Sequence, residues 1–148
     1  MNIVRGSQKM VVNGIKALIA TVLMIIGISG PVSAAGQASI DPAALAVAQT
    51  YFNALKSGDR QTLLTLLVGH ERTRSAAQLD DPAYSRFLMD RYNNARLEVV
   101  DGGVSSGISY VDITIWLNAT ESVKERLILK PTSAGSSSLS ITARKELD

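Results

Sequence analysis

The stretch DPAALAVAQTYFNALKSGD, residues 41–59, contains the start, the buried face and the end of one helix. Asp41 can accept hydrogen bonds from the free N–H groups of the first turn, and Pro42 suits the first helical position. Lys56 and Gly58 are typical of a helix C-terminus, where a cation is favoured and glycine readily adopts a left-handed conformation. Between these signals, apolar side chains recur every three or four residues: Ala44, Leu45, Ala48, Tyr51, Phe52 and Leu55. The stretch therefore predicts an amphipathic helix with one face in a core.

The chain before this helix has the pattern of a secretory signal peptide. Residues 1–16 contain three basic residues and no acidic one, and Ala17–Gly30 is an uncharged apolar run. A proline and small residues then lead to Ala34, as at a signal-peptidase site. The run is shorter than the roughly 20 residues that span a bilayer, which favours cleavage over retention as a membrane anchor. We predict a signal peptide over 1–34, a spacer over 35–40 and a domain over 41–148. The protein is then exported, periplasmic or secreted, and contacts a membrane only if the leader stays uncleaved.

The predicted mature domain is close to neutral. The chain has 15 Lys and Arg residues against 13 Asp and Glu residues, and three of the basic ones, Arg5, Lys9 and Lys16, lie in the leader. The basic character of the chain therefore belongs to the leader and does not indicate nucleic-acid binding. The chain has no Cys, which excludes disulfides, thiolate metal sites and lipid attachment through a Cys. We expect no cofactor and no metal.

Two further helices are predicted between residues 59 and 94. Asp59 can cap a short Leu-rich helix. Asp81-Pro82 repeats the start signal of the first helix, for a helix that ends near Asn93. The polar segment from Gly69 to Leu79 shows no clear apolar period, so we expect it to be irregular or at most a weak helical turn.

After residue 95 the apolar period changes from helical to alternating. Strands are predicted at 96–100, 110–117, 123–130 and 139–143, with a turn at Asp101-Gly102-Gly103 after the first. The two faces of the second strand differ in character: Val111, Ile113, Ile115 and Leu117 on one side, Tyr110, Asp112, Thr114 and Trp116 on the other. Helices followed by antiparallel strands predict an α+β fold, with the helices packed on the aliphatic face of a sheet of about four strands.

The segment Val47–Asp59 also resembles the opening of the nuclear-transport-factor-2-like superfamily. Its pattern is an aromatic residue (Tyr51), Leu55 four residues later, and then Gly58-Asp59. The order of the elements over residues 41–145 fits this superfamily, which includes ketosteroid isomerases, polyketide cyclases and exported proteins of unknown role. The resemblance implies a cone-like fold, in which a strongly curved sheet wraps around the first helix and a cavity opens between them.

The resemblance also provides a catalytic hypothesis for Tyr51. In the isomerases a Tyr at this place donates a hydrogen bond to the developing enolate oxygen, opposite a carboxylate base. Asp112 would be the base here, provided that both side chains line one cavity. The base of the isomerases has no match, because residues 68–81 show no strand pattern, and their second acid has none, because the comparable late strand reads Leu127-Ile128-Leu129. We therefore interpret Tyr51 first as an aromatic residue of the buried helix face.

The mixed strand face indicates a binding surface. If the aliphatic face packs on the helices, then Tyr110, Asp112 and Trp116 lie on the opposite face, where aromatic residues are typical of interfaces. We expect an exported, non-catalytic domain that binds an envelope protein or a small apolar ligand. The alternatives are an isomerase- or cyclase-like enzyme with a Tyr51/Asp112 pocket, or a membrane-anchored assembly component of a secretion system. Exposed strand edges permit a homodimer, which nothing in the sequence specifies.

Overall fold

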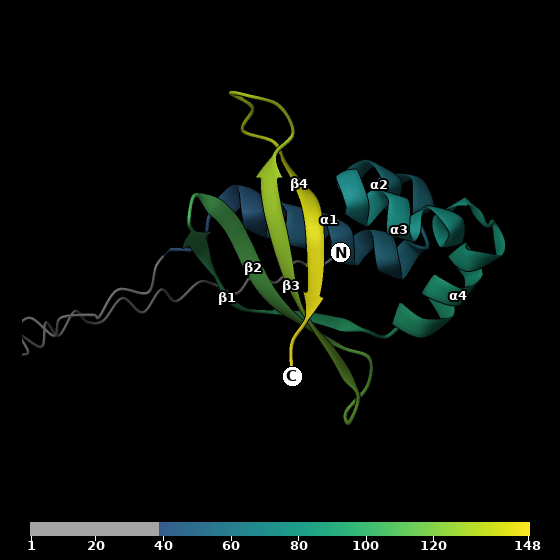
Figure 1. The fold of residues 1–148 in the computed structure, drawn as a ribbon. Coiled ribbons are helices and arrows are strands. Elements are labelled where there is room, and N and C mark those ends of the chain that lie inside the picture. Colours follow the sequence, from purple (N-terminus) through teal and green to yellow (C-terminus); the bar gives the residue numbers. More distant parts are fainter. Residues whose placement is uncertain (1–38) are drawn as a thin grey trace, which may run out of the picture. The chain divides into compact units, whose positions relative to one another are not determined.

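The computed structural model describes residues 39–148, an α+β fold of four helices and one antiparallel sheet (Figure 1). The predicted signal peptide, residues 1–34, lies outside the described residues. The helices are α1 (Pro42–Ser57), α2 (Arg60–Leu66), α3 (Gly69–Asp80) and α4 (Ala83–Tyr92). The strands are β1 (Arg96–Ser105), β2 (Ile108–Trp116), β3 (Ser122–Pro131) and β4 (Leu139–Glu146), and they lie side by side in this order. The predicted fold class is confirmed at this level, and the arrangement is compatible with a cone-like fold.

Helix α1 begins and ends where its sequence signals predict. The Asp41 side chain accepts a hydrogen bond from the Ala43 N–H at 2.9 Å, and Gly58 closes the helix with a φ of 65°. A side chain at Gly58 would also meet the Ser85 carbonyl oxygen of α4, only 2.5 Å from the position of a Cβ atom. Glycine is therefore required here both for the backbone conformation and for the close approach of α4.

Helix α3 corrects the prediction that Gly69–Leu79 is irregular. The segment forms a helix of 12 residues without a side-chain cap at its N-terminus. Its buried residues are Glu71, Ser75 and Leu79, which recur every four residues on one helical face. Because two of these three residues are polar, the segment has a helical period of buried residues without a helical period of apolar residues. Tertiary contacts of these polar side chains, rather than an apolar stripe, hold α3 against the rest of the domain.

Strand β1 continues past the turn predicted at Asp101-Gly102-Gly103. A register shift between Val99 and Asp101 places an extra residue in β1, and pairing with β2 then continues to Ser105. The turn is formed by Ser106 and Gly107, whose φ angles of 53° and 76° match the left-handed geometry of a tight hairpin. The bulge therefore lets the strand pass through a glycine pair that resembles a turn.

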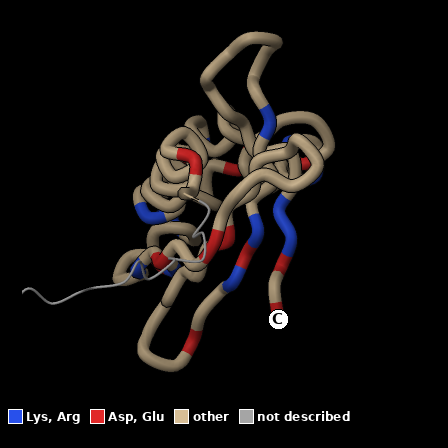
Figure 2. Tube along the Cα trace, turned by 90° about the vertical axis from the view of Figure 1, so that its left-hand side faces the viewer, with Lys and Arg blue, Asp and Glu red and all other residues tan. Residues whose placement is uncertain are grey.

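The two faces of the sheet have different surroundings. Figure 1 shows the helices on one side of the sheet. On that inner face, six aliphatic residues are at most 1 % exposed: Val111, Ile113, Ile115, Leu127, Leu129 and Ile141. No element within residues 39–148 covers the outer face. Figure 2 shows basic and acidic segments on the strand that leads to the C-terminus and on the strand beside it.

Candidate functional site

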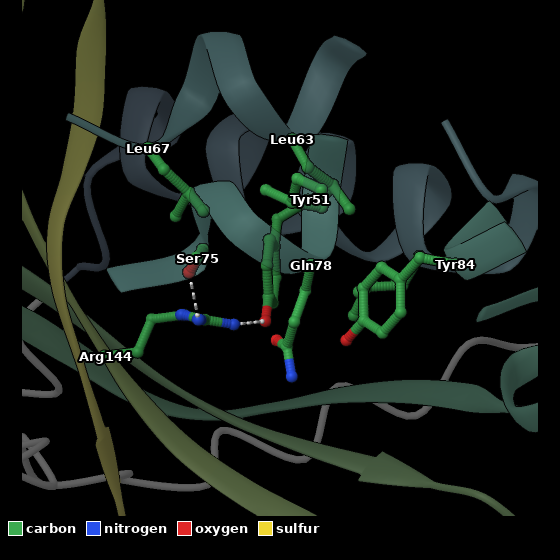
Figure 3. A pocket seen from close by; sticks show the side chains of 9 residues that line it. Tyr51, Leu63, Leu67, Ser75, Gln78, Tyr84 and Arg144 are labelled. Atoms are coloured by element: carbon green, nitrogen blue, oxygen red, sulfur yellow. Dashed lines mark hydrogen bonds between the residues drawn. The ribbon is translucent and has the colours of Figure 1, made fainter. Parts of the chain in front are cut away.

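Tyr51 lies in the interior, between α1 and the inner face of the sheet. It is 2 % exposed and lines a cavity of about 30 Å³, which has room for no more than a few water molecules. Figure 3 shows the Tyr51 hydroxyl, Arg144 and Gln78 close together at this cavity, with Leu63 and Leu67 above them in the view. The lining residues are Tyr51, Leu55, Leu63, Leu67, Ser75, Gln78, Leu79, Tyr84 and Arg144. The cavity at Tyr51 therefore has no space for a substrate of several carbon atoms.

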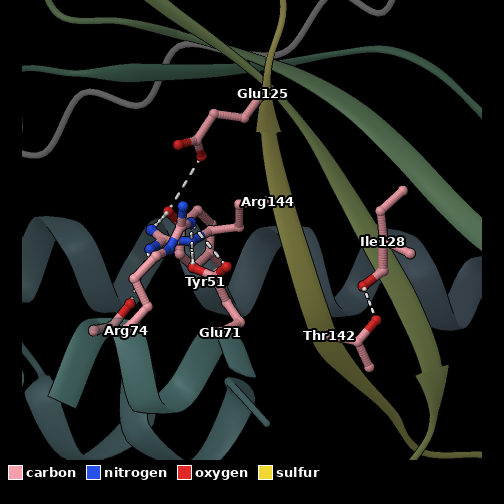
Figure 4. A network of polar contacts seen from close by, with 8 residues as sticks. Tyr51, Glu71, Arg74, Glu125, Ile128, Thr142 and Arg144 are labelled. Atoms are coloured by element: carbon pink, nitrogen blue, oxygen red, sulfur yellow. Dashed lines mark hydrogen bonds and ion pairs between the residues drawn. The ribbon is translucent and has the colours of Figure 1, made fainter. Parts of the chain in front are cut away.

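A cluster of polar side chains joins four elements beside this cavity (Figure 4). Arg144 of β4 is its centre: its guanidinium donates to Glu71 at 2.6 Å, to the Tyr51 hydroxyl at 2.9 Å and to Ser75 at 3.0 Å. The Tyr51 hydroxyl donates in turn to Glu125 of β3 at 3.2 Å. Among the described residues, no buried side-chain nitrogen or oxygen lacks a hydrogen-bond partner. We call Tyr51, Glu71, Ser75, Glu125 and Arg144 the inner cluster.

The acidic groups of the inner cluster have pKa values that are shifted in different directions. Burial disfavours the Glu71 carboxylate, but hydrogen bonds from Arg74 and Arg144 outweigh this and hold the pKa of Glu71 below its ordinary value. Within residues 39–148 Glu125 forms no ion pair, and burial raises its pKa. Burial and the nearby Glu125 carboxylate also raise the pKa of Tyr51. Ionisation is therefore favoured at Glu71 and disfavoured at Glu125 and Tyr51.

Tyr51 and Asp112, the predicted alternative catalytic pair, do not share a cavity. Asp112 points to the outer face of β2, where Arg126 donates to both of its carboxylate oxygens at 2.7 Å. Its neighbours in the strand, Val111 and Ile113, point to the helices. Because successive side chains of a strand alternate between the faces, the sheet itself separates Asp112 from Tyr51. The geometric condition of the isomerase hypothesis is therefore not met by this pair.

The three predicted interface residues lie together on the outer face. The Arg126 guanidinium stacks over the Tyr110 ring at 4.4 Å, and the Tyr110 hydroxyl donates to Asp101 at 3.2 Å. The Trp116 indole N–H donates to Glu98 at 2.7 Å. Tyr110 and Trp116 are half-buried by such contacts, so each presents only part of its ring to solvent.

The outer face also contains a hollow of about 490 Å³, which we call the outer hollow. Its lining combines apolar side chains with charged ones at the rim: Ser105, Ser106, Ile108, Tyr110, Arg126, Ile128, Ala143, Lys145, Glu146 and Leu147. Its volume lies within the range of about 300–1,000 Å³ that is typical of small-molecule sites. The outer hollow is thus much larger than the cavity at Tyr51 and has room for a small ligand.

Sequence reasoning missed four of the five residues of the inner cluster. Glu125 could have been found, because it lies in phase with Val123 and Leu127 on the aliphatic face of its strand. Arg144 could not, because Ile141 and Arg144 point to the same side only through the irregular pairing next to Thr142. Figure 4 shows Thr142 at this place, where its hydroxyl donates to the Ile128 carbonyl. Glu71 and Ser75 lie in the segment that was predicted to be irregular.

Two structural findings and two comparisons with known proteins limit what can be attributed to the site. Residues 39–148 contain no group of three or more His, Cys, Asp or Glu side chains placed to hold a metal ion. None of the helices in this range is long and apolar enough to cross a membrane. No protein-family model matches the chain, and no curated protein matches it either. The resemblance of Val47–Asp59 to the nuclear-transport-factor-2-like superfamily therefore stays a prediction.

Proposed function

We propose that this protein is an exported, non-catalytic domain that binds a protein partner through the outer face of its sheet. The observation that carries this proposal is the contrast between the faces. The inner face is covered by helices, whereas the outer face presents Tyr110, Trp116 and the outer hollow with no described element over them. Aromatic residues and arginines on one accessible surface are typical of protein interfaces. A cone-like fold of the nuclear-transport-factor-2-like type would present its sheet in this way.

The inner cluster supports a structural role in preference to a catalytic one. Tyr51 and Glu125 are a hydrogen-bonded pair of a donor and a carboxylate, as an isomerase would need. However, the adjoining cavity measures only about 30 Å³, and Arg144 already donates to three protein groups. A substrate would have to displace these bonds before it could reach the Tyr51 hydroxyl.

A small apolar ligand in the outer hollow is the second candidate, favoured by the volume of the hollow and by its apolar floor of Ile108, Ile128 and Ala143. The only Trp of the chain, Trp116, lies on the same face and can report on occupancy by its fluorescence. We expect an apolar dye such as 1-anilinonaphthalene-8-sulfonate to bind the protein and Ile128→Lys to weaken that binding. Equal binding by both proteins would exclude the hollow as the dye site.

Site-specific photo-crosslinking tests the protein-binding proposal in the cell. A photoreactive amino acid is placed at Lys124, which is exposed on the outer face, or at Arg72, which is exposed on α3. We expect the Lys124 position to form a crosslinked product of defined mass, and the Arg72 position to form none. Products from Arg72 alone would show that the helix side is the interface and would overturn the proposal.

Trp116→Ala is the matched substitution for this experiment. We expect it to reduce the crosslinked product while the circular dichroism and the Tm of the protein stay close to those of the wild type, because the indole interacts with the exposed side chains of Glu98 and Arg96. Unfolding of this variant would instead assign Trp116 to the core. N-terminal sequencing of the exported protein tests the leader: a start at Ala35 is expected, and a retained leader would favour the membrane-anchored alternative.

A further inference from the structure

We infer that the free edge of β1 accepts an extended, basic segment of a partner protein as an added strand of the sheet. This site differs from the outer face of the proposed function, because it uses backbone groups at the rim of the sheet. An edge strand presents a row of unpaired N–H and C=O groups, which an added strand can bind. The inference rests on an uncovered edge, on two exposed valines and on two acids that form no ion pair.

The two edges of the sheet are covered differently. Figure 1 shows β1 at one edge and β4, with α2 and α3 next to it, at the other. At β4, the Val68 N–H donates to the Ile141 carbonyl oxygen at 3.0 Å, and Leu67 forms a parallel bridge with Ile141. Within residues 39–148, no backbone hydrogen bond joins β1 to any segment other than β2. The edge of β1 is therefore the one that offers its backbone groups to a partner.

The hairpin between β1 and β2 determines which backbone groups of β1 point away from β2. Ser105 and Ile108 flank a tight turn of two residues, so they form a hydrogen-bonded pair. Hydrogen-bonded and non-hydrogen-bonded pairs alternate along antiparallel strands, and β2 keeps this alternation past the bulge in β1. The residues of β1 in the non-hydrogen-bonded pairs have outward N–H and C=O groups. We call them the outward residues: Leu97, Val99, Gly102 and Val104.

The two most exposed large apolar side chains within residues 39–148 both belong to β1. Val104 is 66 % exposed, and Val100, at the bulge, is 62 % exposed. Leu97 and Val99 are only half-buried, at the margin of the core. Side chains on neighbouring strands lie opposite one another and pack together. Apolar residues of an added strand would therefore cover surface that β1 leaves in solvent.

The charge along β1 predicts that the added strand is basic. Glu98 and Asp101 are exposed and form no ion pair within residues 39–148. Each accepts a hydrogen bond from a neutral group of β2, Glu98 from the Trp116 indole at 2.7 Å and Asp101 from the Tyr110 hydroxyl at 3.2 Å. Arg96, at the start of the strand, lies over the Trp116 ring. A strand with basic residues opposite the two acids and apolar residues between them therefore fits β1.

A synthetic peptide, Val-Lys-Val-Lys-Val with blocked ends, is the probe. Its lysines are two residues apart because the β2 residues that pair with Glu98 and Asp101 are also two apart. The isotope-labelled full-length protein is titrated with the peptide to millimolar concentration and followed by NMR. We expect the amide signals of β1 to shift and the N–H groups of the outward residues to exchange more slowly with solvent. The signals of β3 should change little, because β2 separates β3 from the edge.

Two control peptides distinguish strand addition from attraction of a charged ligand. The same peptide with every backbone N–H methylated keeps both charges but cannot pair as a strand, and it should leave the outward residues unprotected. A peptide with Glu in place of each Lys should bind at least about fivefold more weakly, because like charges then face each other.

Substitutions in β1 test the same contacts from the side of the protein. Glu98→Lys and Asp101→Lys should each raise the dissociation constant of the lysine peptide at least about threefold. Asp90→Lys on exposed α4 is the matched control and should leave it unchanged. Val104→Pro removes an outward N–H without removing a hydrogen bond to β2, and it should also weaken binding. Circular dichroism verifies that each variant is folded.

Three results would overturn the inference. The first is a titration in which the β1 signals do not shift, and the second is equal binding of the methylated peptide. The third is a set of shifts centred on β3, which would place the peptide on the outer face. Shifts of β1 that depend on protein concentration without any peptide would assign the edge to a second copy of the chain and would overturn the inference as well. None of these results depends on crosslinking from Lys124, which tests the proposed function separately.

Discussion

Arg144 and Lys145 follow each other on β4, and they belong to the two faces whose contrast organises this domain. Arg144 points inward and donates to Glu71, Tyr51 and Ser75, from two helices that are distant in sequence. Lys145 points outward to the rim of the outer hollow, where within residues 39–148 it has no ionic partner. Nearly identical residue types thus have opposite roles because a strand alternates its side chains. The inner face stabilises the fold, and the outer face is available for binding.

Among substitutions that compare the two faces, we expect those in the aliphatic part of the inner face to change the free energy of unfolding most. Ile113 is 1 % exposed in the centre of β2, and Ile113→Ala should lower the free energy of unfolding by about 3 kcal/mol through lost burial and a remaining cavity. Lys124→Ala, on the outer face of the adjacent strand, should change it by less than about 0.5 kcal/mol. Urea unfolding of both variants measures the difference. Similar losses would mean that the outer face is also part of the stabilising core.

Substitutions of the adjacent residues Arg144 and Lys145 on β4 should have a smaller effect on the free energy of unfolding. Arg144→Ala should lower the free energy of unfolding by about 2 kcal/mol, because the buried Glu71 carboxylate loses one of its two guanidinium partners and two hydroxyl groups lose a donor. Lys145→Ala should change it by less than about 0.5 kcal/mol. The same urea titration compares the two. Equal stability of both variants would contradict the structural role of the inner cluster.

The smallest effect is the pH dependence of Glu125. Burial raises its pKa, so the folded protein binds this proton more tightly than the unfolded chain, and stability falls as the pH rises through the ordinary Glu range toward the raised value. Glu125→Gln removes this loss while keeping an acceptor for the Tyr51 hydroxyl. At pH 7 we expect the free energy of unfolding of the variant to exceed that of the wild type by less than about 1 kcal/mol, which is a few degrees in Tm. In acid we expect this difference to disappear.

Two comparisons make the pH experiment decisive. The pKa of Glu71 is shifted in the opposite direction, because its partners hold it low. Its contribution to the free energy of unfolding is therefore present above the ordinary Glu pKa and is lost as the pH falls. Wild type and Glu125→Gln should therefore both lose stability in acid. Glu98→Gln on the outer face should change the free energy of unfolding at pH 7 by less than about 0.5 kcal/mol. A wild type that is more stable than Glu125→Gln at pH 7 would show that attraction to Arg144 outweighs burial.

Local signals in the sequence were sufficient for the elements that contain them. Asp41, Pro42 and Gly58 predicted both ends of α1, since caps act through the adjacent backbone. The alternation from Tyr110 to Trp116 predicted the two faces of β2, because the side-chain period of a strand is two residues. These local patterns also placed Tyr51 in the interior and Tyr110, Asp112 and Trp116 together on the other side of the sheet.

Only the tertiary structure determined the features that depend on partners distant in sequence. Helix α3 has no apolar stripe, and its Glu71 and Ser75 are buried because Arg144, about 70 residues later, bonds to both. The bulge after Val99 and the irregular pairing at Thr142 arise from the fit between neighbouring strands, and they change which side chains share a face. Asp101, Asp112, Arg126 and Lys145 come from four different strands, and they lie next to one another only once the strands are in register. The physical reason is that a cap or an alternation is encoded within a few consecutive residues, whereas a register and a buried ion pair form between segments that only folding brings together.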